Sequence, residues 1–177
     1  MPGRLLFTWI GKTDLACMAN GLPEPTRGKI AKQLVLSDLP SGLGPIRTLI
    51  EKETFDAVHL ISNYAHDLNR RFAGWLGCNP TVHEVELENP TDYSAVFARV
   101  DGVLRSLAGR WNELCIHLSP GTPAMAAIWV LLGKTRYPAT FFQTHEGRAW
   151  KTEIPFDLIV DFLPAVLHDP DLNLPHL

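Results

Sequence analysis

The sequence has neither an excess of basic residues nor a long hydrophobic run. Its 177 residues include 16 Lys and Arg against 19 Asp and Glu, which gives a net charge of −3. Non-specific binding of duplex DNA or RNA requires a broad basic surface, so any nucleic-acid ligand is expected to be small and bound locally. The apolar stretch near the N-terminus is only about seven residues long, too short for a secretory signal or a membrane span. We therefore expect a soluble, cytoplasmic protein that makes no membrane contact.

Cysteine and histidine are too scattered for a disulfide framework or a metal site. The three cysteines are Cys17, Cys78 and Cys115. Their odd number and wide spacing favour a reducing compartment and exclude a CxxC site. The seven histidines form no HExxH motif and no close His/Cys cluster, so no metal is expected. His59, His83 and His117 fall in strand-like segments, where we expect them to be partly buried and hydrogen-bonded.

Motifs for common cofactors and for conventional catalysis are also missing. No GxGxxG follows a strand-like segment, which excludes a dinucleotide cofactor. GKT occurs at residues 11–13 and 133–135, but Leu6 and Ile128 stand where a phosphate-binding P-loop needs glycine. No GxSxG elbow is present, and no nucleophile–base–orienter triad can be assembled. We expect no cofactor and assign no catalytic residue.

What the sequence does contain is a regular alternation of strand-like and helix-like segments. Apolar side chains make up 46% of the chain, enough for one sizeable core. The predicted strands are 4–10, 57–62, 82–88, 113–119 and 139–144, and the predicted helices are 45–53, 67–77, 93–110 and 123–136. This alternation predicts a doubly wound, Rossmann-like α/β fold with a mostly parallel sheet. A turn at 145–148 predicts a C-terminal antiparallel hairpin.

Three parts of the chain depart from this regular pattern. Residues 1–165 are predicted to form one domain, and the proline-rich residues 166–177 a linker or tail toward a further domain. Residues 15–43 are expected to form an exposed loop or short hairpin, or a lid in which Arg27, Lys29 and Lys32 face a ligand. The segment before Lys134 in the last helix carries no charge, so we expect that helix to be buried all round, by the sheet or by a second subunit.

Polar residues gather where the predicted strands end, and the most distinctive group is SPGTP. There Gly121 permits a tight turn, Thr122 caps the following helix, and Pro123 takes the first helical position. The free N–H groups of such a helix start favour a phosphate, although a plain capped turn has the same pattern. In open α/β sheets, ligands bind at the carboxyl ends of the strands. The candidate ligand-binding residues are Gly11, Lys12, Thr13, Asp14, Ser62, Asn63, Ser119, Pro120, Gly121, Thr122 and Gln143.

HLSPGTPAMAAIWVLLGKTRYPATFFQT resembles the signature region of the CRISPR-associated Rossmann-fold (CARF) domains, in which a strand runs into an [ST]-x-G-T-x-x-M turn and helix. Ser119, Gly121, Thr122 and Met125 stand in the matching places, which adds Met125 to the candidate ligand-binding residues. Within this family, the sequence looks most like the N-terminal sensor domain of RtcR-type RNA-repair regulators. Residues 85–97 are similar to their NP-x-D segment, and the resemblance extends from about residue 82 to residue 156.

The resemblance implies a homodimeric ligand sensor. Two crevices near the dyad would bind a cyclic oligoadenylate or, in the RtcR-like branch, an RNA with a cyclic-phosphate end. The domain would control an attached effector, which the resemblance implies is a transcription activator. Lys12 and Thr13 would form one part of the site and Ser119, Gly121 and Thr122 another, with Asn63 and Gln143 bonding ribose or base edges. One alternative is a metal-independent ring nuclease that cleaves cyclic oligoadenylate. Another is a domain that binds a mononucleotide or only dimerises. No ribonuclease, winged-helix or ATPase segment of such regulators is found in the chain.

Overall fold

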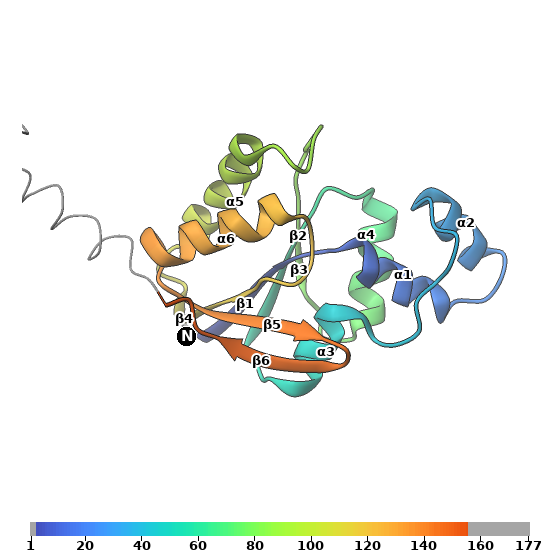
Figure 1. Ribbon diagram of the computed structural model, residues 1–177, viewed down its shortest axis with the longest axis horizontal. Coiled ribbons are helices and arrows are strands. Elements are labelled where there is room, and N and C mark those ends of the chain that lie inside the picture. The colour runs from blue at the N-terminus through green and yellow to red at the C-terminus, as the bar shows by residue number, and fades with distance from the viewer. Residues whose placement is uncertain (1–2, 156–177) are drawn as a thin grey trace, which may run out of the picture.

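The chain folds into a six-stranded sheet in the order β3-β2-β1-β4-β5-β6. The structure is a computed structural model and describes residues 3–155. The strands are β1 (Gly3–Trp9), β2 (Ala57–Ser62), β3 (Thr81–Glu84), β4 (Trp111–His117), β5 (Ala139–His145) and β6 (Arg148–Thr152). The helices are α1 (Lys12–Asn20), α2 (Thr26–Gln33), α3 (Gly44–Lys52), α4 (His66–Leu76), α5 (Tyr93–Leu107) and α6 (Pro123–Thr135). Figure 1 shows their arrangement around the sheet.

The first five strands are parallel, and β6 pairs antiparallel with β5. The predicted doubly wound, Rossmann-like fold with its C-terminal hairpin is therefore confirmed. The strand order reverses between β1 and β4, which are neighbours in the sheet although about a hundred residues separate them in the chain. The predicted tail at 166–177 and the domain boundary at 165 lie outside the described residues.

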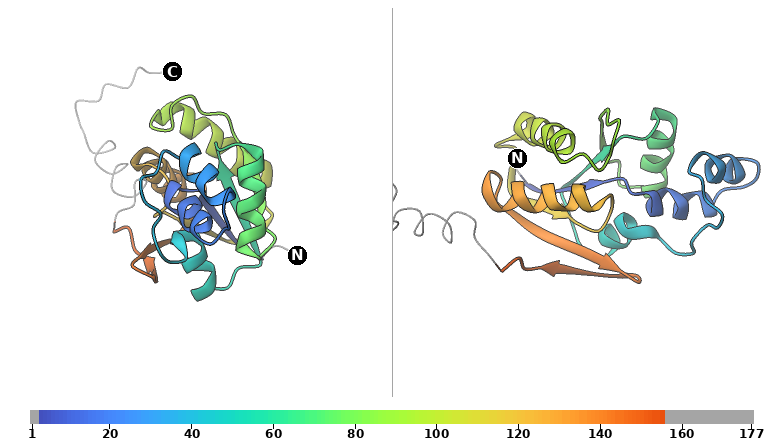
Figure 2. Two further views of the ribbon diagram at one scale, coloured as in Figure 1. Left: turned by 90° about the vertical axis from the view of Figure 1, so that its right-hand side faces the viewer. Right: turned by 45° about the horizontal axis from the view of Figure 1, so that its top comes forward.

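Two hydrophobic cores cover the two faces of the sheet. Successive strand side chains point to opposite faces, so Leu6 of β1 packs in the core with α1, α3 and α4, whereas Phe7 packs in the core with α5 and α6. The right-hand view of Figure 2 shows α5 and α6 on one side of the sheet and α3 on the other. The loops after β1, β2, β3 and β4 each lead to a helix on one face or the other, whereas β5 turns directly into β6.

The prediction of a loop or hairpin over residues 15–43 is wrong, because this segment contains most of α1 and all of α2. Leu15, Met18 and Ala19 of α1 are fully buried, and every residue of that helix from 14 to 19 is buried. A helix buried on all sides lacks the apolar stripe by which a surface helix is recognised. Helix α2 lies at one end of the molecule (Figure 1), and its Ile30 anchors it in the core.

Two further details differ from the sequence-based predictions. Strand β3 ends at Glu84 rather than at residue 88, since it is an edge strand whose last part turns away into the loop before α5. Helix α6 is not buried all round: it presents Pro123, Ala127 and Leu131 outward, and the side chain of Leu131 is 40% exposed. These three residues are four positions apart and share one face of the helix. The sheet and α5 cover the rest of α6.

Candidate ligand-binding site

Two helices begin at the point where the strand order reverses. Strand β1 leads into α1 on one face of the sheet, and β4 leads into α6 on the other. Their starting loops touch: a Cβ on Gly11 would lie 3.2 Å from the backbone nitrogen of Gly121 and 3.2 Å from Cβ of Pro120. The N-termini of α1 and α6 thus meet at one place. Because helix N-termini offer free N–H groups and a partial positive charge, this place suits an anion such as phosphate.

The SPGTP turn has the conformation that the sequence predicts. Gly121 has φ +96°, in the region that favours glycine. The Thr122 hydroxyl accepts a hydrogen bond from the Met125 nitrogen at 3.3 Å, which caps α6, and donates one to the Pro90 carbonyl at 2.8 Å. Met125 is buried beneath the turn, with Sδ 2.7 Å from where a Gly121 Cβ would lie. Met125 and Thr122 therefore hold the turn in shape.

Ser119 joins the end of β4 to the end of β5. Its hydroxyl accepts from the Thr144 nitrogen at 2.7 Å and donates to the Thr144 carbonyl at 3.1 Å. The Thr144 hydroxyl in turn lies 2.9 Å from Nε2 of His117. Ser119 thus positions the loop next to the helix N-termini. Thr144 has a central place in this arrangement, which sequence reasoning did not assign to it.

His117 is completely buried, and burial lowers its pKa to about 3. Its ring is therefore neutral near pH 7. The prediction that the strand histidines are partly buried and hydrogen-bonded needs correction here, since Nδ1 of His117 has no hydrogen-bond partner among the described residues. His59 and His83 do fit the prediction: Nδ1 of His59 lies 2.9 Å from Nε2 of His83, and their rings stack.

Asp14 lies at the switch point, the place between β1 and β4 where the strand order reverses, but its side chain does not face solvent. Its side chain is completely buried, and its carboxylate accepts hydrogen bonds from the nitrogens of Gly11, at 3.2 Å, and Ile46, at 2.8 Å. It therefore holds the starts of α1 and α3 together. Burial outweighs these hydrogen bonds and raises the pKa of Asp14 to about 7. The neighbouring Lys12 and Thr13 are exposed.

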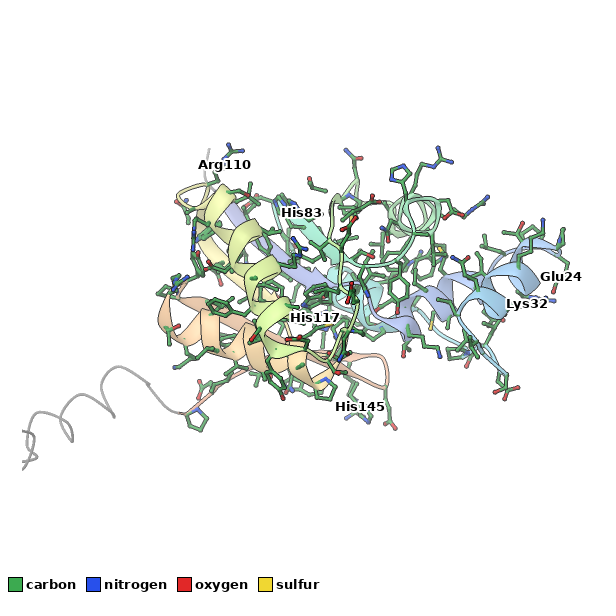
Figure 3. All side chains as sticks on the ribbon, turned by 90° about the horizontal axis from the view of Figure 1, so that it is seen from above. Glu24, Lys32, His83, Arg110, His117 and His145 are labelled. Carbon is green, nitrogen blue, oxygen red and sulfur yellow. The ribbon has the colours of Figure 1, made fainter. Side chains whose placement is uncertain are left out.

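Lys12 is the cation in the first turn of α1. Its Nζ lies 3.4 Å from the carbonyl of Val35 in the loop that follows α2. Lys29 and Lys32, two residues of the predicted lid, are exposed on α2. Lys32 lies near the end of the molecule opposite Arg110 (Figure 3). The loop after α2, rather than the helix itself, is thus the part of this segment that reaches the switch point.

The remaining candidate residues lie to either side. Ser62 is completely buried and its hydroxyl donates to Oδ1 of Asn69 at 2.6 Å. Asn63 is half-buried and lines a separate cavity of about 560 Å³ beside the loop 84–88. Gln143 is half-buried and accepts a hydrogen bond from the Thr152 hydroxyl at 2.9 Å. The structure thus brings Gly11, Pro120, Gly121 and Thr122 together, while Asn63 and Gln143 flank this group.

The described residues contain neither a metal-binding cluster nor a helix suited to a membrane. In residues 3–155, no group of three or more His, Cys, Asp or Glu lies close enough together to hold a metal ion. Over the same residues, no helix is both long and apolar enough to cross a membrane.

No protein-family model matches the sequence, and no curated protein matches it either. Solved structures do match the fold. Csm6 of Enterococcus italicus, bound to cyclic hexa-2'-fluoro-hexa-dAMP, superposes with a TM-score of 0.59 at 15% identity, over 93% of this chain and 43% of Csm6. A type III CRISPR defence DNA nuclease activated by cyclic oligoadenylate gives a TM-score of 0.51 at 17% identity, over 85% of this chain and 20% of the nuclease.

The chain therefore spans less than half the length of either protein. At these identities the similarity concerns the backbone arrangement and not the individual residues of the site. It supports the Rossmann-like α/β fold that the sequence pattern predicts. What this chain shares with Csm6 and with the nuclease is the fold.

Proposed function

We propose that this protein is a sensor domain that binds a cyclic oligoadenylate, or an RNA ending in a cyclic phosphate, and controls an attached effector such as a transcription activator. The observation that carries the proposal is the meeting of the α1 and α6 N-termini, where Gly11 lies against Gly121. Phosphates of a small ring fit such a place because its N–H groups bind anions without a basic exterior. The similarity in fold to Csm6 and to a nuclease activated by cyclic oligoadenylate agrees with this ligand class.

Within the site, each residue has a different task in this proposal. Lys12 supplies a point charge to a phosphate, and Thr13 offers an exposed hydroxyl beside it. Thr122 and Ser119 act mainly through the backbone, because their hydroxyls already bond the Pro90 carbonyl and Thr144. The ligand then contacts the N–H groups that these two residues hold in place. Asn63 and Gln143 lie at the flanks, within reach of the sugar or base edges of a larger ring.

The sensor is proposed to act as a homodimer. Pro123, Ala127 and Leu131 form an uncharged outward face on α6, and α6 starts at the proposed phosphate site. Pairing of two such faces across a two-fold axis is isologous, since each subunit offers the same patch. It would place two switch-point sites near one axis, as a ring-shaped ligand with repeated phosphates requires.

The test is calorimetric titration of the 177-residue protein with cyclic tri-, tetra- and hexa-adenylate and with a short RNA ending in a 2',3'-cyclic phosphate. We expect binding of one of these at one ligand per dimer, and at least tenfold weaker binding by Lys12→Ala. A matched control is Lys151→Ala, which removes an exposed lysine of β6. Absence of heat with all four ligands would contradict the proposal.

The same samples separate a sensor from a ring nuclease. Chromatography of the ligand after long incubation should recover it uncut if the domain only senses. Linear products would instead assign the protein to the ring nucleases, in which the site would position a ribose 2'-hydroxyl in line with the phosphate.

A further inference from the structure

A cavity of about 460 Å³ lies between α1, the start of α3 and the turn of the β5–β6 hairpin. It adjoins the proposed phosphate site through two of its lining residues. Thr13 is in the first turn of α1, two residues after Gly11, and Thr144 is bonded to Ser119, which follows β4. A ligand held at the switch point can therefore extend into this cavity. Figure 3 shows His145, in the hairpin turn at the cavity rim, at the edge of the molecule, and His117 further inside.

The walls of the cavity suit a flat, uncharged group better than a phosphate. Pro40, Leu43 and Pro45 supply apolar surface, and Gly42 adds no side chain between them. Among the charged lining residues, Lys52 is accompanied by two carboxylates, those of Glu51 and Glu146. Because Glu51 is paired with Arg47, these charges nearly balance and leave no net positive charge to hold an anion. Phosphates are thus expected to stay at the helix N-termini, while a neutral part of the ligand enters the cavity.

Glu146, in the turn of the β5–β6 hairpin, carries the carboxylate best placed to select that neutral group. Glu51 is already paired with Arg47, at 3.2 Å between Oε1 and Nε. Glu146 has a longer contact, 3.6 Å from its Oε1 to Nε2 of His145, and both side chains are largely exposed. A carboxylate accepts hydrogen bonds and donates none when ionised. It therefore favours a ligand group that carries N–H hydrogens over one that carries only acceptors.

We propose that this cavity holds a nucleobase of the bound oligonucleotide and prefers a base with an exocyclic amino group, whose hydrogen the Glu146 carboxylate accepts. This inference rests on the proposed function and deepens it by assigning base selection to the hairpin turn and the loop before α3. The neutral ring of His117 supports the arrangement from below, because its Nε2 lies 2.9 Å from Oγ1 of Thr144. Phosphate contacts then provide affinity, and the cavity provides base selectivity.

The experiment compares cyclic tetra- and hexa-adenylate with the corresponding inosine rings, in which a 6-oxo group replaces the 6-amino group. We expect the wild-type protein to bind the better adenine ring at least about threefold more tightly than its inosine counterpart, as loss of one charge-assisted hydrogen bond to an exposed carboxylate predicts. In Glu146→Gln the preference should fall to about twofold or less, because a glutamine amide can bond either group. Glu153→Gln, which changes an exposed glutamate outside this cavity, is the control and should keep the wild-type preference.

A second variant tests the cavity itself. Ser41→Trp places a large ring at an exposed lining residue and should weaken binding of both adenine and inosine rings at least tenfold. The inference is overturned, with the sensor function intact, if rings bind and neither Glu146→Gln nor Ser41→Trp changes affinity or preference.

If no ring binds the wild-type protein, the proposed function fails and the cavity is tested separately with adenosine and inosine by amide chemical shifts. Shifts confined to the loop 40–45 and the hairpin turn, and larger with adenosine, would support the base site on its own. Absence of such shifts would overturn the inference as well.

Discussion

Gly121 determines the geometry of the turn that starts α6. Its φ of +96° is strained for any other residue, and a Cβ there would lie 2.7 Å from Sδ of Met125 and 3.3 Å from Cβ of Trp9. We expect Gly121→Ala to lower the free energy of unfolding by about 1–3 kcal/mol and to weaken binding of the adenylate ring, because the N–H groups of α6 move. Urea unfolding and calorimetry measure the two effects.

The control for this variant is Gly102→Ala. Gly102 is exposed in α5, and an added Cβ there meets no atom within 4 Å. Alanine is better than glycine inside a helix, so the free energy of unfolding should rise by about 0.5–1 kcal/mol. If Gly121→Ala were as stable as the wild type and bound the ring equally well, the assigned role of the turn would be wrong.

His117 should make the protein sensitive to acid. Burial lowers its folded-state pKa to about 3, below the ordinary value near 6.5, so the unfolded chain binds a proton that the folded chain does not. Its contribution to stability is complete above about pH 6.5 and is lost as the pH falls toward 3. The slope is about 1.4 kcal/mol per pH unit. Unfolding free energies of the wild type and of His117→Asn between pH 7 and pH 4 should show a flatter dependence in the variant.

Asp14 has the opposite pH dependence in an overlapping range. Its pKa is raised to about 7 by burial, so its contribution to stability is complete below about pH 4 and is lost as the pH rises toward 7. Tyr64 and Cys17 interact with this carboxylate and have raised pKa values themselves. Asp14→Asn should therefore steepen the loss of stability in acid, where His117→Asn reduces it. Identical pH profiles for both variants and the wild type would contradict these assignments.

At the scale of the element, the N-caps of α5 and α6 can be compared to separate loss of stability from loss of ligand binding. Asp92 caps α5 by accepting from the Ser94 nitrogen at 2.8 Å, and Thr122 caps α6 by accepting from the Met125 nitrogen at 3.3 Å. Replacing either by alanine should cost about 1 kcal/mol of stability. Only Thr122→Ala should also weaken ring binding, since only α6 starts at the switch point. Equal affinities for the two variants would place the ligand elsewhere.

How well a helix could be predicted from the sequence depended on whether one of its faces is exposed to solvent. Helices α3, α4 and α5 carry one apolar face, and their sequence pattern predicted α3 and α4 to within one residue and α5 to within three residues. Helix α1 follows Gly11, which has no capping side chain, and its residues 14–19 are buried without interruption, so no apolar stripe marked it. The one available signal was Asp14, three residues after Gly11, which accepts the hydrogen bond of the Gly11 nitrogen.

The candidate site was predictable in its location but not in the use of its side chains. Topology alone brings the ends of β1 and β4 together, and the sequence predicted Gly11, Gly121 and Thr122 there. It could not show that the Ser119 hydroxyl would be hydrogen-bonded to the backbone of Thr144, or that Asp14 would be buried between two helix starts. These pairings join residues 25 and 32 positions apart, and a single sequence carries no local pattern for such contacts.

At the scale of the whole molecule, the outward face of α6 is where dimerisation can be tested. Leu131 is 40% exposed and is the largest side chain of this uncharged face. A glutamate there would be solvated in a monomer but unpaired and desolvated in a two-fold contact, where it would occur twice. We expect Leu131→Glu to weaken dimerisation at least a hundredfold, on the order of 3 kcal/mol, while the free energy of unfolding of the monomer changes little. Sedimentation equilibrium measures the dimer dissociation constant.

Ligand binding provides the second readout of the same variant. If a ring is shared by two subunits, Leu131→Glu should weaken its binding together with dimerisation, although Leu131 lies two turns from the start of α6 and touches no proposed phosphate contact. Gln33→Glu adds the same charge on the exposed end of α2 and should change neither property. A wild-type protein that stays monomeric with a saturating ring, or a Leu131→Glu protein that still dimerises, would exclude this face as the subunit contact. The switch-point site would then have to hold its ligand within one subunit, where only one pair of helix N-termini meets it.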